Sequence, residues 1–239
     1  MISVCMATYN GEKFIKEQLK SILYQLSNVD EVIISDNCSS DKTVQIIESF
    51  KDKRIKLLIF EKKNIVLNFE NALNNSIGDI IFLADQDDVW LEGKVELCLQ
   101  GLEAVDLVLT NAVIVDENLK KTNSSFFEYR KTTKGLLKNI YKNTYVGSCM
   151  AFRRSILKKA LPFPRNIAMH DCWIGLVAEL NGSITHIDQA LLLYRRHGNN
   201  ASNSSGKTSK SIIEIISIRF WLVYYLLKLY FCSVLNKFN

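Results

Sequence analysis

The stretch Phe82-Leu-Ala-Asp-Gln-Asp-Asp-Val-Trp90 decides the fold, because an apolar run passes directly into three carboxylates. The run 79–84 is typical of a buried strand. Three carboxylates within four residues would repel one another in a dry site, so their clustering indicates a divalent cation that neutralises them. The alternative is that Asp88 caps a following helix, since carboxylates favour helix N-termini. Both can hold, with Asp88 at the cap while Asp85 and Asp87 face a ligand.

Outward from this stretch, the first 110 residues alternate strands and helices. Strands are expected at 2–7, 32–35, 55–60, 79–84 and 107–110, and helices at 12–25, 41–50 (capped by Ser40 or Asp41), 66–75 and 92–103. Strands separated by helices of this length predict βαβ units, and therefore an α/β fold with a mostly parallel sheet flanked by helices.

Polar clusters follow three of the expected strands, at Thr8–Gly11, Asp36–Asp41 and Asp85–Asp88. In parallel sheets the ligand crevice lies at the carboxyl ends of the strands, so the clusters predict a crevice there. The carboxylate of Asp36 can accept a hydrogen bond from a base or a ribose, and the alternative is a simple turn-forming residue. The fold alone does not say which ligand binds.

The second half of the chain has a less regular pattern. A helix is expected near Thr133–Lys142, a strand at 147–152, a helix at 169–180 and a strand at 190–194. His170-Asp171 opens the second of these helices in a stretch poor in acidic residues. A partly buried carboxylate beside basic residues can be a general base. A capping aspartate is an equal alternative on spacing alone.

The positive charge is concentrated in one block, although the net charge is only +5. No Asp or Glu lies between Tyr129 and His170, whereas ten Lys or Arg do. Such a block favours an anionic partner, which would be phosphate, nucleic acid or acidic lipid headgroups. The alternative is a solvated basic face. We expect no nucleic acid, because the acidic cluster at 85–88 does not fit a nucleic-acid binder.

Length and cysteine usage narrow the class of protein. The 239 residues suit one large domain or one domain with an appendage. None of the six cysteines forms a Cys-x-x-Cys pair, which argues against a zinc site and a disulfide scaffold. The start of the chain has neither a basic leader nor an apolar core, so no signal peptide is expected. A cytoplasmic location follows from these features.

The carboxyl-terminal part begins with an expected flexible connector at 201–211, followed by the apolar segment 212–239. Within Ile212–Leu235 the charges of Glu214, Arg219 and Lys228 leave eight residues as the longest uncharged run. That run is shorter than the roughly 18 residues of a spanning helix, and the Trp and Tyr content suits a membrane interface. We favour an in-plane membrane anchor. A helix that packs on the domain or forms a homodimer, and a spanning helix, are the alternatives.

Taken together, the motifs resemble the glycosyltransferase family 2 enzymes, of the GT-A fold. The resemblance rests on six motifs in this order: Ala7-Thr-Tyr-Asn-Gly11, Ser35-Asp-Asn-Cys-Ser-Ser-Asp-Lys-Thr43, Phe82–Trp90, Gly147-Ser-Cys-Met-Ala-Phe152, His170-Asp-Cys-Trp173 and Tyr194-Arg-Arg-His-Gly-Asn-Asn200. It implies a GT-A domain over 1–200, with a nucleotide-sugar half at 1–111 and an acceptor half at 112–200. The form of the motifs looks like bacterial rhamnosyl-, galactosyl- and glucosyltransferases of surface-polysaccharide assembly.

The resemblance also implies roles for individual residues. The nucleotide sugar would be held by Thr8, Tyr9, Asn10, Asp36, Asp85, Gln86 and Arg195. Asp87 and His197 would hold Mg²⁺ or Mn²⁺ at the diphosphate, and Asp171 would be the general base. The motifs depart from the common family pattern at Asn37, at Asn64-Ile65 and at Thr110-Asn111.

The implied function is inverting transfer of galactose, glucose or rhamnose from a nucleotide-diphosphate sugar. The implied acceptor is a polyprenyl-diphosphate-linked saccharide of O-antigen, lipopolysaccharide or capsule synthesis, at the inner face of a bacterial membrane. A nucleotidyltransferase is the enzyme alternative, but Thr8–Gly11 lacks the Gly-rich basic loop usual there. A membrane-tethered module that only binds nucleotide or sugar is the non-enzyme alternative. An intact Asp87 and Asp171 argue against it.

Overall fold

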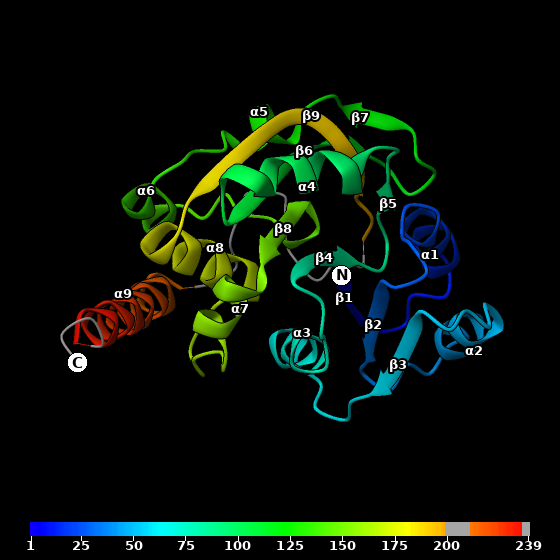
Figure 1. Ribbon diagram of the computed structural model, residues 1–239, viewed down its shortest axis with the longest axis horizontal. Helices are drawn as coiled ribbons and strands as arrows, with labels where there is room; N and C mark the ends of the chain where they lie inside the picture. Colours follow the sequence, from blue (N-terminus) through cyan, green and yellow to red (C-terminus); the bar gives the residue numbers. More distant parts are fainter. Residues whose placement is uncertain (199–210, 236–239) are drawn as a thin grey trace.

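One mixed sheet runs through the molecule, with helices packed along it (Figure 1). The computed structural model describes residues 1–198 and 211–235. Its strands are β1 (Ile2–Thr8), β2 (Glu31–Asp36), β3 (Ile55–Ile59), β4 (Ile80–Asp85), β5 (Val89–Trp90), β6 (Leu107–Val115), β7 (Lys121–Asn123), β8 (Met150–Arg153) and β9 (Ile184–Arg195). Its helices are α1 (Ile15–Leu23), α2 (Thr43–Ser49), α3 (Ile65–Asn74), α4 (Lys94–Ala104), α5 (Phe126–Arg130), α6 (Leu136–Tyr141), α7 (Arg154–Ala160), α8 (His170–Asn181), α9 (Ile212–Leu235) and the 3₁₀ helix η1 (Gly147–Cys149). The predicted connector, apart from Ser211, and residues 236–239 lie outside the described residues.

The first half of the chain forms the parallel part of the sheet. Strands β3, β2, β1 and β4 lie side by side in that order, and each neighbouring pair is parallel. Strand β1 is buried along nearly its whole length, as expected of a parallel strand covered on both faces. Helix α3 packs on β1 and β2, and α1 buries Ile15, Leu19 and Ile22. The α/β fold class predicted from the sequence is confirmed.

The second half extends the same sheet with strands of mixed direction. Strand β8 is antiparallel to β4 and β6, β6 is parallel to β9, and β9 is antiparallel to β5. The full order is β3-β2-β1-β4-β8-β6-β9-β5, and β7 pairs with β6. Residue 111, where the sequence analysis divides the two halves, lies inside β6. The sheet is therefore continuous from one half to the other.

Two strands are longer than the sequence predicts. Strand β6 continues past Thr110 to Val115, and β9 begins at Ile184 rather than at residue 190. The two strands pair along this extra length with register shifts around Asn111. Asn111 is buried, yet its Oδ1 accepts the N–H of Phe127 (3.0 Å) and its Nδ2 donates to the carbonyl of Asp188 (3.1 Å). Its amide group is thus satisfied by residues of α5 and β9, so the strand continues through this buried polar residue instead of ending before it.

Several short elements are absent from the sequence-based expectations. The structure adds β5, β7, α5 and α7, and the strand expected from residue 147 begins as η1 before β8. Each addition spans seven residues or fewer. A periodic pattern needs a longer window than this to be recognised, so these elements carry little sequence signal.

The helix after the acidic cluster starts later than predicted, and Asp88 does not cap it. Helix α4 begins at Lys94, and its N-cap is Gly93 in a left-handed conformation (φ 80°) with no side-chain cap. Glycine adopts this conformation without steric cost. The Asp88 Oδ1 atom accepts the backbone N–H of Arg195 at 2.9 Å. The capping alternative for Asp88 is therefore wrong. The N-cap of α2 is Lys42 rather than Ser40 or Asp41, although the Asp41 carboxylate accepts the N–H of Thr43, the first residue of α2 (2.9 Å).

The apolar segment at the carboxyl-terminal end forms the single helix α9. It contacts α6 and α8, and it buries Leu222 and Leu226. Many other apolar side chains of this helix are exposed, among them Ile213, Ile216, Phe220, Val223, Tyr224, Leu227 and Phe231. By length and composition the segment Ile213–Cys232, with mean hydropathy 1.5 and 11% buried, can cross a membrane. The spanning helix, one of the sequence-based alternatives, is thus compatible with the length and composition of this segment.

Candidate active site

The three polar clusters at the strand ends meet in space. The Gln86 side chain forms two hydrogen bonds with Tyr9: its Oε1 accepts the Tyr9 N–H (2.9 Å) and its Nε2 donates to the Tyr9 carbonyl (3.0 Å). The Asn10 N–H donates to the Ser39 hydroxyl at 2.8 Å. The loops after β1, β2 and β4 are thus fastened to one another, and the predicted edge of the sheet is a single site.

Asp36 is a fixed, buried member of this edge. Its carboxylate accepts hydrogen bonds from the Thr8 hydroxyl (2.7 Å), the Ser39 N–H (2.7 Å) and the Ser39 hydroxyl (2.6 Å). The residue is fully buried. Asn37, the next residue, faces the adjoining cavity instead, while its Nδ2 donates to the carbonyls of Phe60 and Lys62. In this structure Asp36 therefore shapes the loop, and Asn37 is the neighbour that a ligand would meet.

A cavity of about 520 Å³ opens beside these loops. Its wall includes six of the predicted site residues: Thr8, Tyr9, Asp85, Gln86, Asp87 and Asp171. The other four predicted residues, Asn10, Asp36, Arg195 and His197, are not part of the wall. The remaining wall is Ala7, Asn37, Lys63, Asn64, Ile65, Asn68, Phe126, Arg130, Asn143, Tyr145, Val146, Gly147, Met169, His170 and Tyr194. The cavity thus joins the strand ends to α3, α5 and the start of α8.

Two carboxyl groups of the acidic cluster, those of Asp85 and Asp87, line this cavity. Burial, together with the charges of Asp87 and Asp171, raises the pKa of Asp85 to about 7. Burial and the charges of Asp87 and Asp85 hold the pKa of Asp88 well above its usual range. A carboxyl group is disfavoured as the anion both by burial and by a like charge nearby. This arrangement is typical of sites where a cation binds.

Asp171 lies across the cavity from the strand ends, in the first turn of α8. Its Oδ2 accepts the backbone N–H of Gly147 (3.2 Å) and its Oδ1 accepts the N–H of Cys172 (2.6 Å). These two bonds fix the plane of the carboxylate while leaving lone pairs for a ligand. Burial raises the pKa of Asp171 to about 6. The group is therefore ionised at neutral pH and a stronger base than an exposed aspartate.

His197 and Arg195 reach the acidic cluster from the end of β9. The His197 Nε2 lies 2.8 Å from the Asp87 Oδ2, and the imidazole packs on the ring of Phe14. Arg195 is buried; its Nε donates to the Asp87 carbonyl (2.7 Å), and its Nη2 pairs with the Glu17 carboxylate (2.6 Å). Arg195 thus lies behind the Asp87 backbone, where it holds the acidic loop against α1.

The residues present fit a divalent cation whose coordination is completed by a substrate. Within residues 1–198 and 211–235, no group of three or more His, Cys, Asp or Glu side chains is arranged to hold a metal. The Asp87 carboxylate and the His197 imidazole are paired, however, and the partly buried Asp85 carboxyl group lies near Asp87. A cation with few protein ligands takes the rest from water or phosphate oxygens, as Mg²⁺ commonly does. Imidazole also suits transition metals, and carboxylate suits Mn²⁺.

Several wall residues have no counterpart among the predicted site residues. Asn68 on α3 and His170 on α8 line the cavity although both are almost completely buried. Arg130 and Lys63 add positive charge, and the Arg130 charge lowers the pKa of Asp171. A polar residue within a predicted apolar helix face, as at Asn68, is the one signal that sequence reasoning had available.

Comparison with known proteins agrees with this geometry. The family model described as Glycosyl transferase family 2 matches residues 3–161 of the chain. The matched range contains the strand ends, α3 and η1, and it ends before Asp171, Arg195 and His197.

Two curated relatives and one solved structure extend over most of the chain. The dTDP-rhamnosyl transferase RfbG of Shigella flexneri is 28% identical over 215 residues, 82% of this chain and 72% of RfbG. The UDP-Glc:alpha-D-GlcNAc-diphosphoundecaprenol beta-1,3-glucosyltransferase WfgD of Escherichia coli is 26% identical over 210 residues, 87% of this chain and 81% of WfgD. The crystal structure of S. aureus TarS 1-349 in complex with UDP-GlcNAc superposes with a TM-score of 0.73 at 25% identity. The match covers 93% of this chain and 66% of that TarS chain.

The placement of Arg195 leads to a prediction about the ligand-free protein. Replacing Arg195 with Lys removes the guanidinium group that bonds to both the Asp87 carbonyl and the Glu17 carboxylate, and the single ammonium group of lysine cannot make both contacts in the same geometry. We expect the free energy of unfolding to fall by about 2 kcal/mol, because each lost charged hydrogen bond contributes about 1.5–3 kcal/mol and lysine restores part. Urea unfolding without nucleotide measures it. The matched control is Arg196→Lys, since the Arg196 guanidinium contacts the exposed Tyr129, by a hydrogen bond to its hydroxyl and by lying over its ring. Equal stability of Arg195→Lys and wild type would contradict the positioning role.

Proposed function

Because the chain belongs to glycosyl transferase family 2, we propose that it is an inverting, metal-dependent enzyme that transfers a hexose or deoxyhexose. The donor is a nucleotide-diphosphate sugar, and the acceptor is a hydroxyl of a lipid-linked saccharide in O-antigen, capsule or related polysaccharide synthesis. The observation that carries the proposal is that Asp85, Asp87 and Asp171 line one cavity, each from a predicted motif. A cation site and a base thus face the same space.

The donor would occupy the side of the cavity formed by the strand ends. Thr8, Tyr9 and Asn37 offer polar groups beside the β1 and β2 loops, where a base and a ribose fit. Asn10 and Asp36 do not line the cavity, but their hydrogen bonds to Ser39 hold these loops in place. Asp85 and Gln86 would meet the ribose and the sugar, with Arg195 holding their loop from behind.

The diphosphate would lie at Asp87 and His197. These two side chains would hold Mg²⁺ or Mn²⁺, and the carboxyl group of Asp85 lies close enough for its charge to be felt there. When bound, the cation offsets the negative charge that develops on the leaving diphosphate. The positive charges of Lys63 and Arg130 on the cavity wall favour the same anion.

We infer that Asp171 acts as the general base. Its backbone bonds to Gly147 and Cys172 aim the carboxylate into the cavity, and its raised pKa near 6 suits proton transfer at neutral pH. As an acceptor hydroxyl oxygen bonds to the anomeric carbon, its proton passes to Asp171 and the bond from that carbon to the phosphate oxygen breaks. Attack from the face opposite the leaving diphosphate inverts the anomeric configuration. One base is sufficient for this single displacement.

The names of the relatives guide the choice of substrates. RfbG is described as a dTDP-rhamnosyl transferase and WfgD as a UDP-Glc transferase acting on a diphosphoundecaprenol-linked sugar. We propose a dTDP- or UDP-linked sugar donor and a polyprenyl-diphosphate-linked saccharide acceptor for this chain as well. The chain spans 60% of the length of two TarS chains that it matches. The activity of the whole protein is part of what we propose.

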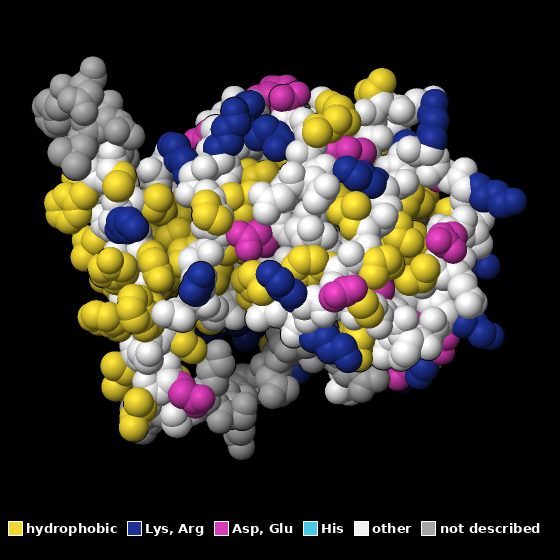
Figure 2. All heavy atoms as spheres, turned by 90° about the horizontal axis from the view of Figure 1, so that it is seen from below, with side chains coloured by type: hydrophobic (Ala, Val, Ile, Leu, Met, Phe, Trp, Pro, Cys, Tyr) yellow, Lys and Arg dark blue, Asp and Glu magenta, His cyan; other side chains and the backbone are white. Residues whose placement is uncertain are grey.

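We propose that α9 and α6 form a membrane-facing surface, which places the enzyme at the inner face of the cell membrane. Figure 2 shows hydrophobic side chains gathered along α9, at the left of that view. Helix α6 contacts α9, and Arg219 donates to the carbonyl of Tyr141 (2.6 Å). Helix α6 and the residue that follows it add exposed Leu137, Lys138 and Lys142, the last two suited to anionic headgroups.

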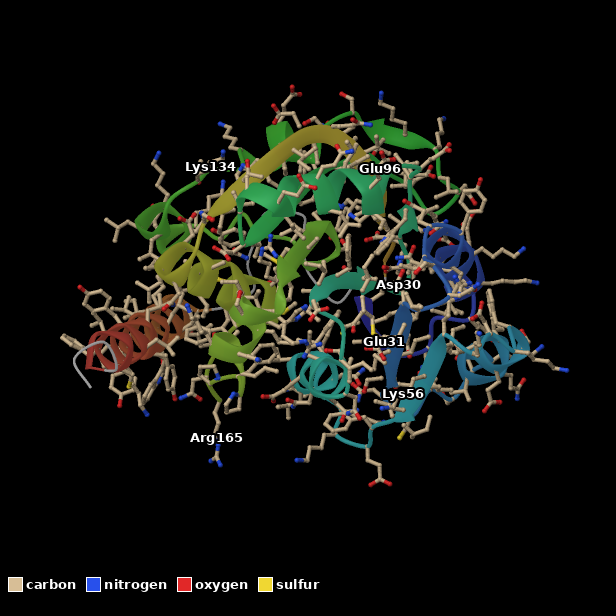
Figure 3. All side chains as sticks on the ribbon, viewed as in Figure 1. Asp30, Glu31, Lys56, Glu96, Lys134 and Arg165 are labelled. Carbon is tan, nitrogen blue, oxygen red and sulfur yellow. The ribbon has the colours of Figure 1, made fainter. Side chains whose placement is uncertain are left out.

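The rest of the basic block contributes little to this surface. Lys134, before α6, and Arg165, after α7, lie on opposite sides of the molecule (Figure 3). The basic block is therefore not confined to one face of the molecule. Lys138 and Lys142 lie on or next to α6, which contacts α9, so we propose a membrane rather than a long polyanion as the partner of this surface.

The base assignment predicts a separation of binding from turnover. We expect Asp171→Asn to bind UDP-glucose or dTDP-rhamnose as the wild type does and to lose transfer by about 10²–10⁴-fold, because an amide cannot accept the proton. Calorimetry measures binding, and release of UDP or dTDP measures turnover. The wild-type rate should also fall as pH drops through about 6, where Asp171 becomes protonated. This acid limb should be absent from the residual rate of the variant.

The control for this prediction is Asp188→Asn, which changes an exposed aspartate outside the cavity wall in the same way. It should retain both binding and turnover. If Asp171→Asn lowered binding and turnover by one common factor, Asp171 would be a binding residue rather than the base.

The cation site predicts that transfer depends on a divalent metal and on Asp87. EDTA should abolish transfer, and Mg²⁺ or Mn²⁺ should restore it. Asp87→Ala should remain inactive even at saturating Mn²⁺, because the cation loses its carboxylate ligand. Asp79→Ala, at the opposite end of β4 and highly exposed, is the matched control and should respond to metal as the wild type does. Wild-type rates for Asp87→Ala would exclude this residue as the metal ligand.

The exposed apolar side chains of α9 are predicted to bind a membrane. They are not expected to contribute to the stability of the fold. We expect the triple variant Ile216→Ser, Phe220→Ser, Leu227→Ser to keep the wild-type melting temperature and to lose most binding to anionic lipid vesicles. Each serine removes an apolar contact with lipid but leaves Leu222 and Leu226 buried. Vesicle sedimentation measures binding.

The control carries the same change at exposed apolar sites elsewhere, Tyr24→Ser and Ile77→Ser. It should bind vesicles as the wild type does. A triple variant that binds vesicles normally but changes from dimer to monomer in light scattering would assign this face to a homodimer instead.

A further inference from the structure

His170 carries buried polar atoms that the protein leaves unpaired. It is the first residue of α8 and is 2% exposed. Among the described residues neither ring nitrogen, Nδ1 or Nε2, has a hydrogen-bond partner. Buried polar groups in native proteins nearly always have one, so two such atoms in one ring require an explanation. Because His170 lines the cavity, a bound molecule can supply the partner.

The ring of His170 is held in a fixed position and in its neutral form. It stacks on Phe69 of α3 with the ring centroids 3.8 Å apart and the planes 24° apart. Burial lowers the pKa of His170 to about 3. A neutral imidazole offers one N–H donor and one nitrogen acceptor, and it carries no charge to attract a phosphate.

A second unpaired polar atom lies on the helix that carries Phe69. Asn68 is 2% exposed and lines the cavity. Its Nδ2 donates to the Thr8 carbonyl (3.3 Å), which fixes the amide, but its Oδ1 has no partner among the described residues. The cavity wall therefore presents a fixed acceptor from α3 together with a donor and an acceptor from α8.

Gly147 keeps the space beside His170 open. A Cβ atom at this position would lie 3.2 Å from the His170 Nε2 and 3.6 Å from the Cβ of Asp171. The Gly147 N–H also donates to the Asp171 carboxylate. The glycine thus lies between the unpaired imidazole and the proposed base, where a side chain would crowd both.

We propose that Asn68 and His170 form a neutral subsite that binds hydroxyl groups of a sugar beside Asp171. This inference rests on the proposed glycosyltransferase function and deepens it. A hydroxyl group both donates and accepts, so neighbouring hydroxyls of one sugar ring match the mixed donors and acceptors of the subsite. A diphosphate, which only accepts, does not match the unpaired Asn68 Oδ1. The subsite would select among sugars, whereas the acidic loop at Asp87 would hold the part common to all donors.

The hydroxyls can belong to the donor sugar or to the acceptor saccharide, and nitrogen NMR separates the two sources. The chain has only three histidines, so ¹⁵N-histidine labelling yields three sets of ring signals. The His170→Leu variant assigns the set of interest. The probes are UDP, dTDP, UDP-glucose, UDP-GlcNAc, dTDP-rhamnose and an α-GlcNAc diphospholipid, each added with Mg²⁺.

We expect UDP or dTDP to leave the His170 ring signals in place and one of the sugar-bearing probes to shift them. A shift with a nucleotide sugar assigns the subsite to the donor, and a shift only on adding the diphospholipid assigns it to the acceptor. His170→Leu should lower the affinity for that same probe about tenfold, the effect of one hydrogen bond to a neutral group. Its affinity for UDP or dTDP should not change.

Stability distinguishes a binding role from a structural one. His170→Leu removes two unpaired buried polar atoms, so the ligand-free variant should melt no lower than the wild type. Gly147→Ala should reproduce the tenfold loss of sugar affinity, because its methyl group crowds the Nε2. His186→Leu is the matched control, since His186 is half-buried outside the cavity wall, and it should keep wild-type affinities.

Two results overturn the inference while leaving the proposed function in place. One is a protein that binds a nucleotide sugar with the His170 signals unmoved by every probe. The other is a His170→Leu variant that melts several degrees lower and loses UDP and sugar affinity alike, which would make His170 a structural residue bonded to internal water. A wild-type protein that binds none of the probes and hydrolyses no nucleotide sugar overturns the proposed function and this inference together.

Discussion

Asp85, Asp87 and Asp88 place three carboxyl groups within four residues at the buried end of β4, and the surroundings of the loop are arranged around that charge. Burial and mutual repulsion both oppose their ionisation, which is why the pKa of Asp85 rises to about 7. Partial compensation comes from the backbone N–H and the guanidinium of Arg195, which contact Asp88 and the Asp87 carbonyl. Asp85 and Asp87 line the cavity, where a bound cation would stabilise the ionised form of both carboxyl groups.

Arg195 also explains why the last strand is long. It stands at the end of β9, and β9 pairs with β6 over most of its length before it reaches the acidic loop. Within its guanidinium group, Nε donates to the Asp87 carbonyl and Nη2 pairs with the Glu17 carboxylate of α1. The second half of the chain is therefore tied to the first through the site itself. The buried guanidinium of Arg195 contacts both the acidic loop and α1. A change in the position of α1 should therefore also move the acidic loop.

The parallel half of the fold could be predicted because its signals are local. An apolar run such as Val4–Met6 followed by turn residues predicts a buried strand, and the polar clusters then predict which ends meet. The strands of the second half could not be predicted in full, because their limits depend on contacts between residues far apart in the sequence. Asn111 lies inside a strand only because Phe127 and Asp188 satisfy its amide. A helix cap is one sequence-based alternative for Asp88, yet the N-cap of α4 is Gly93, in a left-handed conformation and with no side-chain bond.

The same division runs through the site. Asp87 and Asp171 stand in motifs whose chemistry is visible in the residue types, so the charged end of the cavity was open to sequence reasoning. His170 stands in a motif that the sequence shows, but its unpaired ring nitrogens, like the unpaired Oδ1 of Asn68, are seen only in the structure. Charge can hold a diphosphate whatever sugar it carries, since the phosphates are the same in every donor. Discrimination between sugars must come from neutral groups set at fixed positions, because hydroxyls differ in place and not in charge. The part of this enzyme that would decide its substrate is thus the part with the weakest mark in the sequence.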